Sequence, residues 1–291
     1  MKKPFLKSFL LLLLMPLCVF AQEKAERPDS SALAADVLQP GRFVRSGATL
    51  SLGLITTSFD SYLSPNNYMG FELSFLNENW RRSAGCETLF LQSISDTSVG
   101  LVVAGSSSSS FVVDEALSDA WAWRIGRLGP VAFCAGPEWQ GRFGLVYNTR
   151  NSNNPANVKL GLHVGGMGMA EVRYRIFRIP VRTSYQVDMP LVGAVFSPQY
   201  SQSYYEIFTL KHFAGTVHFV SPHNGFSLRH ILTTDMTLRH SILRLSVLSD
   251  SYQYRTSTNS FALCSLRLGV GLVFNSYAIY PREKAYDYLP Y

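Results

Sequence analysis

Val158-Lys159-Leu160-Gly161-Leu162-His163-Val164 is the stretch that decides the fold, because its even positions are apolar and its odd positions are not. The even phase continues through Ala170, Val172, Tyr174 and Ile176, with charged residues in the odd phase. A helix would place its apolar residues at intervals of three and four instead. This period of two predicts a long β-strand with one apolar and one polar face, as in a wall between two solvents.

The same alternation recurs along the chain, in segments 69–75, 131–147, 228–239, 243–247 and 262–275. If these strands close into a barrel with their apolar faces outward, the polar faces line its lumen. The candidate lumen-lining residues are Glu138, Gln140, Arg142, Lys159, His163, Glu171, Arg173, Arg175, Arg229, Asp235, Arg244 and Arg267.

Turn signals separate these runs and allow the strands to be counted. They lie at Ser95-Asp96-Thr97, Leu128-Gly129-Pro130, residues 151–155 and residues 222–225, and the serine run 106–110 is expected to be a loop. The count predicts about twelve strands (10–14).

The first 21 residues have the anatomy of a secretory signal peptide. Three lysines precede the apolar stretch 9–15, which is too short for an ordinary membrane-spanning helix, and Val19-Phe20-Ala21 fits the small-residue rule for cleavage. Cys18 follows Leu17 rather than a small residue, which argues against lipidation. We therefore expect a cleaved signal peptide over 1–21, a polar lead-in over 22–41 and a β-barrel domain over 42–291.

The composition excludes some function classes. Hydrophobic residues make up 47% and charged residues 16% of the 291, which argues against intrinsic disorder. The net charge of +6 includes the three leader lysines, so 23 basic residues face 20 acidic ones afterwards, and this modest excess predicts no nucleic-acid partner.

Three cysteines remain after the leader: Cys86, Cys134 and Cys264. Their wide spacing fits neither a complete disulfide framework nor a zinc site. The alternation places Cys134 and Cys264 on opposite faces of the wall, so a bond between them is not expected.

Three features favour a membrane barrel over a soluble sandwich. The runs 130–148, 156–176, 203–221 and 259–275 exceed the usual strand length. Tyrosine and tryptophan gather near run ends, as in the girdles of membrane barrels, at positions 121, 123, 147, 204, 205, 252, 254, 277 and 280. The last run, 267–274, resembles the terminal signal of outer-membrane barrels. We therefore predict a closed antiparallel transmembrane β-barrel in the bacterial outer membrane, in contact with its lipid and inserted by the barrel-assembly machinery.

The connection lengths conflict with this prediction. Bacterial barrels alternate short periplasmic turns with long outer loops. If the last strand ends inside, a count of twelve puts the long connections around 148–156 and 190–203 on the periplasmic side. Either one strand is miscounted or the barrel breaks the usual asymmetry.

No segment carries a recognisable catalytic or cofactor-binding motif, so we predict no catalytic residue, metal or cofactor. The expected role is a structural barrel, a narrow pore or a passive binder. One alternative is an outer-membrane lipid-modifying hydrolase acting through His223 or Ser227, although the intervening Asn224-Gly225 is a strong turn dipeptide. The other alternative is a soluble secreted β-rich binding protein.

The most distinctive segment is 189–208, a proline-punctuated stretch leading into aromatic residues. It resembles a segment of the domain of unknown function 3316, an uncharacterised bacterial family. That resemblance implies a signal peptide and an outer-membrane β-barrel, and it implies no activity. The segment is expected to be either an aromatic girdle or an ordered loop folded into or over the lumen.

Overall fold

The computed structural model describes residues 43–82, 86, 88–105, 108–152, 154–200, 202–239 and 241–277. These residues contain eleven strands and one short helix. The elements are β1 (Phe43–Asp60), β2 (Asn67–Arg82), β3 (Leu89–Ala104), β4 (Ser108–Leu128), β5 (Val131–Asn148), β6 (Ala156–Ile176), β7 (Ile179–Phe196), α3 (Tyr204–Phe208), β8 (Val217–Val220), β9 (Gly225–Thr237), β10 (Ile242–Arg255) and β11 (Ser260–Tyr277). The predicted signal peptide and lead-in lie outside the described residues.

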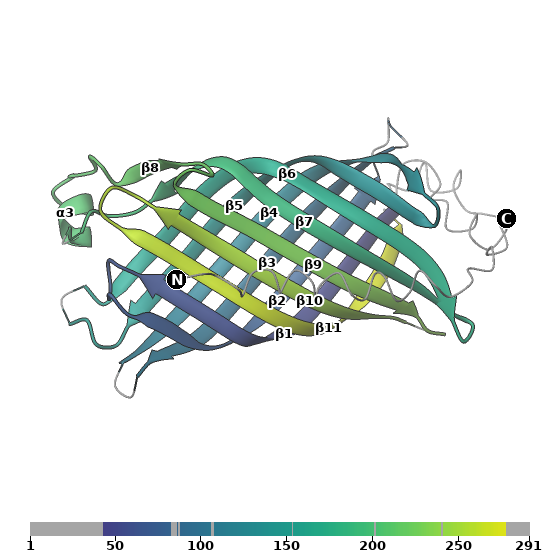
Figure 1. The fold of residues 1–291 in the computed structure, drawn as a ribbon, viewed down its shortest axis with the longest axis horizontal. Coiled ribbons are helices and arrows are strands. Elements are labelled where there is room, and N and C mark those ends of the chain that lie inside the picture. The colour runs from purple at the N-terminus through teal and green to yellow at the C-terminus, as the bar shows by residue number, and fades with distance from the viewer. Residues whose placement is uncertain are drawn as a thin grey trace, which may run out of the picture. The chain divides into compact units, whose positions relative to one another are not determined.

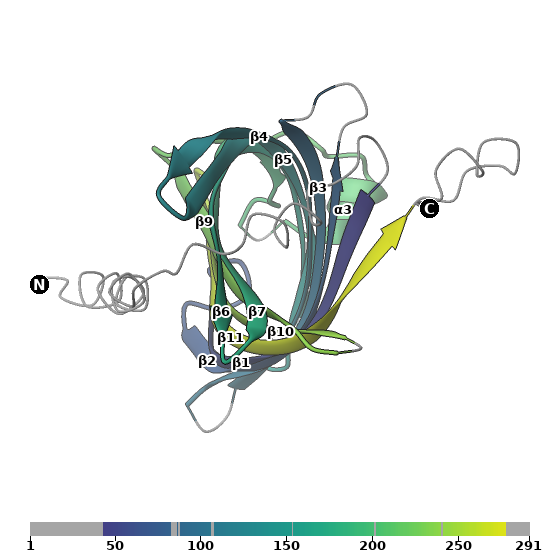
Figure 2. The same ribbon diagram turned by 90° about the vertical axis from the view of Figure 1, so that its right-hand side faces the viewer.

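Ten of the strands close into an antiparallel barrel. Each strand from β1 to β6 pairs with the strand that follows it in the sequence. In the ring β7 then pairs with β9, β9 pairs with β10, and β10 pairs with β11. The ring closes where β1 meets β11, from Phe43 opposite Tyr277 to Asp60 opposite Phe261. Figure 1 shows the tilted strands from the side, and Figure 2 shows the ring that they form around a lumen.

The eleventh strand, β8, pairs only with the last four residues of β7 and does not complete the ring. The count of about twelve is therefore wrong, and the barrel has ten strands. The run 203–221 was expected to be one long strand, but it contains α3, a connection and β8. Among the described residues, no helix has both the length and the apolar character needed to cross a membrane.

The two ends of the barrel differ in the length of their connections. At one end, here called the turn end, β1 begins, β11 ends, and two of the connections have only two residues, 129–130 and 177–178. At the other, the loop end, seven residues join β5 to β6, and residues 197–224 join β7 to β9. With ten strands the two longest connections, 149–155 and 197–224, lie at the end opposite the start of β1 and the end of β11. The conflict between connection lengths and the expected barrel therefore came from a miscounted strand.

The two-residue turn between β6 and β7 has an unusual composition. Phe177 and Arg178 both have positive φ angles, 47° and 75°, as a type I′ hairpin turn requires. Such turns favour asparagine and glycine because other residues are strained in this region. The turn between β4 and β5 follows the preference, since Gly129 has φ 59°.

The wall is apolar outside and polar inside. Large hydrophobic side chains such as Leu52, Phe71 and Val270 are about half exposed on the outer face. Their neighbours in the opposite phase are buried inside, many of them charged or hydroxyl-bearing. Two sheets stacked face to face, which a soluble sandwich requires, do not occur in the part of the chain that the structure describes.

The lumen also contains buried apolar clusters. Leu76 and Ile94, on β2 and β3, pack with Ile231 and Leu248, on β9 and β10. Because these strand pairs are not neighbours in the ring, this apolar bridge crosses the lumen. Six side chains form a second cluster on the β2–β6 side: Trp80, Ala120, Ala122, Cys134, Met167 and Met169.

Candidate functional site: the charged lumen

Charged side chains fill the lumen and pair between strands that are far apart in the sequence. They form three ionic clusters, named here by position along the barrel. The turn-end cluster contains Arg45, Glu78, Glu171, Arg182, Asp235 and Arg244; the central cluster contains Glu138, Asp188 and Arg229; and the loop-side cluster contains Glu72, Asp96, Asp114, Arg142, Asp250 and Arg267.

Asp235 is the centre of the turn-end cluster. Its carboxylate lies 2.7 Å from Arg45, 2.7 Å from Arg244 and 3.4 Å from Arg182. Arg244 also pairs with Glu78, and Arg182 pairs with Glu171. Three arginines therefore face three carboxylates, so the formal charge of this cluster is zero.

The central cluster surrounds Arg229, which is 3% exposed. Its Nε lies 2.8 Å from Asp188, and its Nη2 lies 3.2 Å from Glu138 and donates to Ser118 Oγ at 2.7 Å. Ser118 and Glu138 belong to β4 and β5, whereas Arg229 belongs to β9. The guanidinium therefore joins opposite parts of the wall.

In the loop-side cluster, carboxylates outnumber the arginines. Arg267 lies 2.6 Å from Glu72 and 2.8 Å from Asp96. Arg142 pairs with Asp250 and lies 3.4 Å from Asp114, and its guanidinium stands over the Tyr252 ring, 4.4 Å from the ring centroid. Two arginines thus face four carboxylates here. With the central cluster, the formal count is three arginines against six carboxylates.

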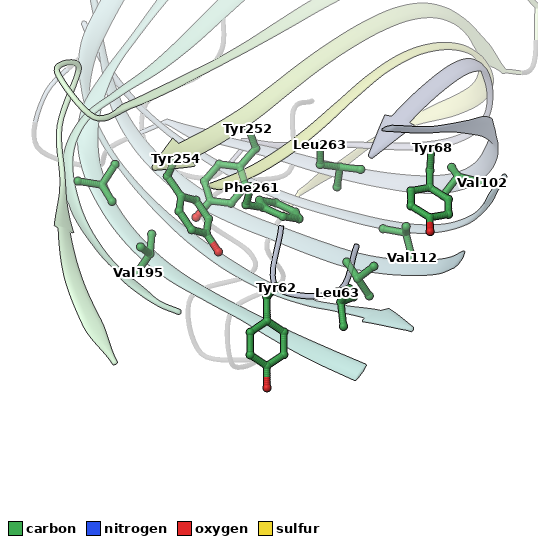
Figure 3. Close-up of a cluster of buried hydrophobic side chains, with 12 residues drawn as sticks. Tyr62, Leu63, Tyr68, Val102, Val112, Val195, Tyr252, Tyr254, Phe261 and Leu263 are labelled. Carbon is green, nitrogen blue, oxygen red and sulfur yellow. The ribbon is translucent and has the colours of Figure 1, made fainter. Parts of the chain in front are cut away.

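Aromatic side chains occupy the lumen near the loop end. Tyr252, Tyr254 and Phe261 lie against one another, with ring centroids 5.4–6.0 Å apart (Figure 3). Lys159 lies among them, 4.3 Å from the Phe261 ring centroid, and pairs with Asp60 at 2.8 Å. The expected aromatic girdle is therefore wrong for Tyr252 and Tyr254, which point into the lumen.

The connection of residues 197–200 and 202–224, here called the cap, is tied to several parts of the loop end (Figure 1). Tyr62 Oη donates to the Gln202 carbonyl at 2.6 Å, and Tyr204 Oη donates to Asn157 Oδ1 at 2.9 Å. Asn259 donates to the carbonyl of Pro198. The cap is thus an ordered loop held by β6 and by the β1–β2 and β10–β11 connections.

Two phenols that hold the cap have raised pKa values. Burial, assisted by the carboxylates of Asp60 and Glu206, raises the pKa of Tyr62 to about 12. Burial likewise raises the pKa of Tyr204 above its usual range. Both phenols therefore stay neutral, and able to donate, at ordinary pH.

The structure brings together most of the residues that the sequence suggested as lumen-lining. Those in or beside the ionic and aromatic clusters are Glu138, Gln140, Arg142, Lys159, His163, Glu171, Arg229, Asp235, Arg244 and Arg267. Arg173 pairs with Glu171 but its side chain is 35% exposed, and Arg175 is exposed at the turn end of β6.

Sequence reasoning missed about half of the charged residues in the lumen. Asp96 was assigned to a turn, although it lies inside β3 and pairs with Arg267. Glu72 was not named as lumen-lining, although a signal was available. Its apolar neighbours Phe71 and Leu73 place it on the polar face of the alternating segment 69–75. A signal was present for Arg182 as well, because Tyr185, Val187 and Met189 alternate with Ser184, Gln186 and Asp188, which share its phase.

The two residues named for the hydrolase alternative, His223 and Ser227, form no hydrogen bond with each other within the described residues. The ring of His223 is exposed and hydrogen-bonded to Ser221, within the turn before β9. Ser227 lies in β9, opposite Tyr252. No group of side chains able to hold a metal ion occurs among the described residues.

Cys134 and Cys264 form no disulfide bond, so the expectation that these two cysteines do not pair is confirmed. Cys134 is buried in the lumen, and Cys264 lies in the opposite phase, near Ser251.

One family matches most of the chain. It is described as "Protein of unknown function (DUF3316)", and the match covers residues 9–283. No curated protein matches the chain.

Several solved structures are similar in outline. The outer membrane protease OmpT from Escherichia coli has a TM-score of 0.44 at 6% identity, over 83% of this chain and 99% of that one. Neisserial surface protein A (NspA) gives 0.30 at 10% identity, over 80% and 97%. The COG4313 outer membrane channel from Pseudomonas putida F1 gives 0.32 at 10% identity, over 81% and 97%. These scores are too low to assign a property to this chain.

Proposed function

The chain belongs to the family described as Protein of unknown function (DUF3316), and we propose that it is a bacterial outer-membrane β-barrel closed by its own side chains, with a structural role rather than that of an open pore. The family brings no activity, so the proposal rests on the geometry of the barrel.

The outer face supports the membrane part of this proposal. Its exposed leucine, valine and phenylalanine side chains would contact lipid acyl chains, which water would not favour. A closed ring also leaves no strand edge unpaired, as a hydrocarbon environment demands. The two longest connections lie at the end opposite the start of β1 and the end of β11, which fits the usual bacterial arrangement with the turn end facing the periplasm.

The single observation that carries the closed lumen is the burial of its cross-strand ion pairs. Arg244, Arg267 and Arg229 are 1%, 2% and 3% exposed, and each joins strands that are not neighbours. The apolar bridge from Leu76 to Ile231 crosses the same space. A water-filled channel would leave these groups hydrated.

Export and insertion complete the proposal. A signal peptide over 1–21 would direct the chain across the inner membrane, and the last strand, β11, would be read by the barrel-assembly machinery.

The proposal predicts three results for the full-length protein made in a bacterium. It stays in the urea-washed outer-membrane pellet, and it migrates differently on a detergent gel before and after boiling. Purified and inserted in planar bilayers, it gives no stepwise conductance under conditions in which a general porin does.

Two of these results can overturn different parts of the proposal. Recovery in the soluble fraction would contradict the membrane barrel. A stable unitary conductance from the pelleted protein would contradict the closed lumen and favour a narrow pore.

A further inference from the structure

A polar patch interrupts the apolar outer wall on β2, β3 and β4. On β3 it consists of Ser93, Ser95 and Thr97, all outward in phase. On the same strand, Leu89 and Leu91 precede the patch and three apolar side chains follow it, at positions 99, 101 and 103. The patch therefore lies within the surface that we assign to lipid.

Two carboxylates belong to this patch. Glu115 and Asp119 lie on the outer face of β4, with Phe111 and Val113 on one side and Trp121 on the other. Glu115 accepts hydrogen bonds from Ser95, at 2.7 Å, and from Thr97. Asp119 forms no hydrogen bond or ion pair within the described residues.

The other edge of the patch carries an amide. Asn77 lies on the outer face of β2, and its side chain likewise forms no hydrogen bond in the part of the chain that the structure describes. Asn77 lies opposite Ser95, and Asp119 lies opposite Ser93. The two residues are therefore offset by only two positions along the strands, about 7 Å.

Acyl chains offer these groups no hydrogen-bond partner, so the patch needs a polar surface against it. Two copies of a barrel inserted in the same sense can form a closed pair only about a two-fold axis along the membrane normal. Such an axis brings β2 of one copy against β4 of the other, at the same height. The Asn77 amide of each copy then meets the Asp119 carboxylate of its partner.

We propose that the outer face of β2, β3 and β4 binds a second copy of this chain, with Asn77 and Asp119 paired across a two-fold interface. This inference rests on the membrane barrel proposed above. The donors and acceptors of the patch complement each other, so no other protein is required.

The test compares association in detergent micelles and in native membranes. In N77D, a carboxylate replaces the amide opposite Asp119, so dimerisation should weaken about tenfold or more, because like charges oppose each other. In N77D/D119N the roles are exchanged, and dimerisation should return. Q253E, which adds a carboxylate to the outer face of β10, is the matched control and should leave the dimer unchanged.

Disulfide trapping tests the geometry directly. In a background with all four cysteines replaced by alanine, N77C and D119C are co-expressed with different tags. A cross-link between the two tags should form in higher yield than a cross-link in either variant alone.

A wild-type protein that is monomeric in membranes, or an N77D variant that dimerises like wild type, would overturn this inference. So would capture of a different protein by N77C without a cross-linked pair of this chain. If the barrel is in the urea-washed pellet and heat-modifiable but monomeric, the dimer proposal alone fails. If it is not in the pellet, the membrane proposal fails first.

Discussion

Asp235 and Asp114 are both buried aspartates of the lumen, but their cationic surroundings differ. Asp235 contacts three arginines, and no other carboxylate reaches Arg45 among the described residues. Among the described residues, the one ion pair of Asp114 is with Arg142, at 3.4 Å, and Asp250 already pairs with that arginine. A buried charge is costly when it loses its partner, so the two positions should respond differently to the same change.

We predict that D235N destabilises the barrel by about 3–5 kcal/mol, because it leaves buried guanidinium groups without their shared carboxylate. D114N should change the free energy of unfolding by less than about 1 kcal/mol, because it removes a carboxylate from a cluster that has too many. Urea unfolding in lipid vesicles, followed by tryptophan fluorescence, measures both. Equal losses in the two variants would show that the formal charge balance does not control stability.

Tyr62 provides a pH-dependent contact at the cap. Its pKa is raised to about 12, so the folded state favours the neutral phenol. The stabilisation is complete below pH 10, the ordinary pKa, and is lost as the pH rises from 10 to about 12. The ionised oxygen can no longer donate to the Gln202 carbonyl.

Y62F should therefore be less stable than wild type by about 1 kcal/mol at pH 8, the contribution of one hydrogen bond. The difference should disappear as the pH approaches 12. Thermal unfolding followed by circular dichroism at several pH values gives both quantities. A difference that stays constant up to pH 12 would assign the effect to packing instead.

At the scale of the strands, alternation predicted most of the wall. The face assignments on β5, β6 and β9 were readable because apolar outward residues alternate with charged inward ones. Alternation failed on β3, where Ser95, Asp96 and Thr97 are polar on both faces: Asp96 binds an arginine in the lumen, and its neighbours belong to the outer patch. In the sequence alone, a turn and a strand segment with polar residues on both faces have the same composition. Only the pairing with the neighbouring strands distinguishes them.

The prediction of one long strand over 203–221 was wrong for another reason. Its aromatic residues suggested a strand end at a membrane interface, but Ser203 caps α3 through reciprocal hydrogen bonds with Glu206. The Ser-x-x-Glu spacing was present in the sequence and would have indicated a helix start. The ion pairs between distant strands could not be predicted, since partners such as Arg267 and Asp96 are 171 positions apart.

The turn between β6 and β7 allows a prediction for one element. Replacing Phe177-Arg178 by Asn-Gly should stabilise the barrel by about 1 kcal/mol, because both positions have positive φ. G129A, at φ 59° in the neighbouring turn, should destabilise it by a similar amount. Urea midpoints of the two variants measure the effects, and a loss of stability in the Asn-Gly variant would show that Phe177 has a role outside the turn.

At the scale of the whole molecule, the cap and the wall are separable. The ring closes through β6 and β7 and through β1 and β11, none of which requires residues 198–215. Ser197 donates its N–H to the Thr216 carbonyl at 2.8 Å, so the two ends of the cap already meet.

Replacing residues 198–215 by Asn-Gly should leave a folded, heat-modifiable barrel in which β7 and β8 form a hairpin. The lumen should still not conduct, because the ionic clusters and the apolar bridge remain. A conductance gained by this variant, measured in planar bilayers against wild type, would assign the closure to the cap instead.

The seam between β1 and β11 has a further consequence. Phe43 and Tyr277 are ladder partners at the turn end, so the first and last strands meet where a short hairpin turn could join them. Every other neighbouring pair in the ring is already joined by a connection of its own. The ring should therefore not depend on which strand comes first in the chain. A circular permutant in which a short turn joins β11 to β1, and whose new ends lie between Gly129 and Pro130, should form the same ten-stranded barrel.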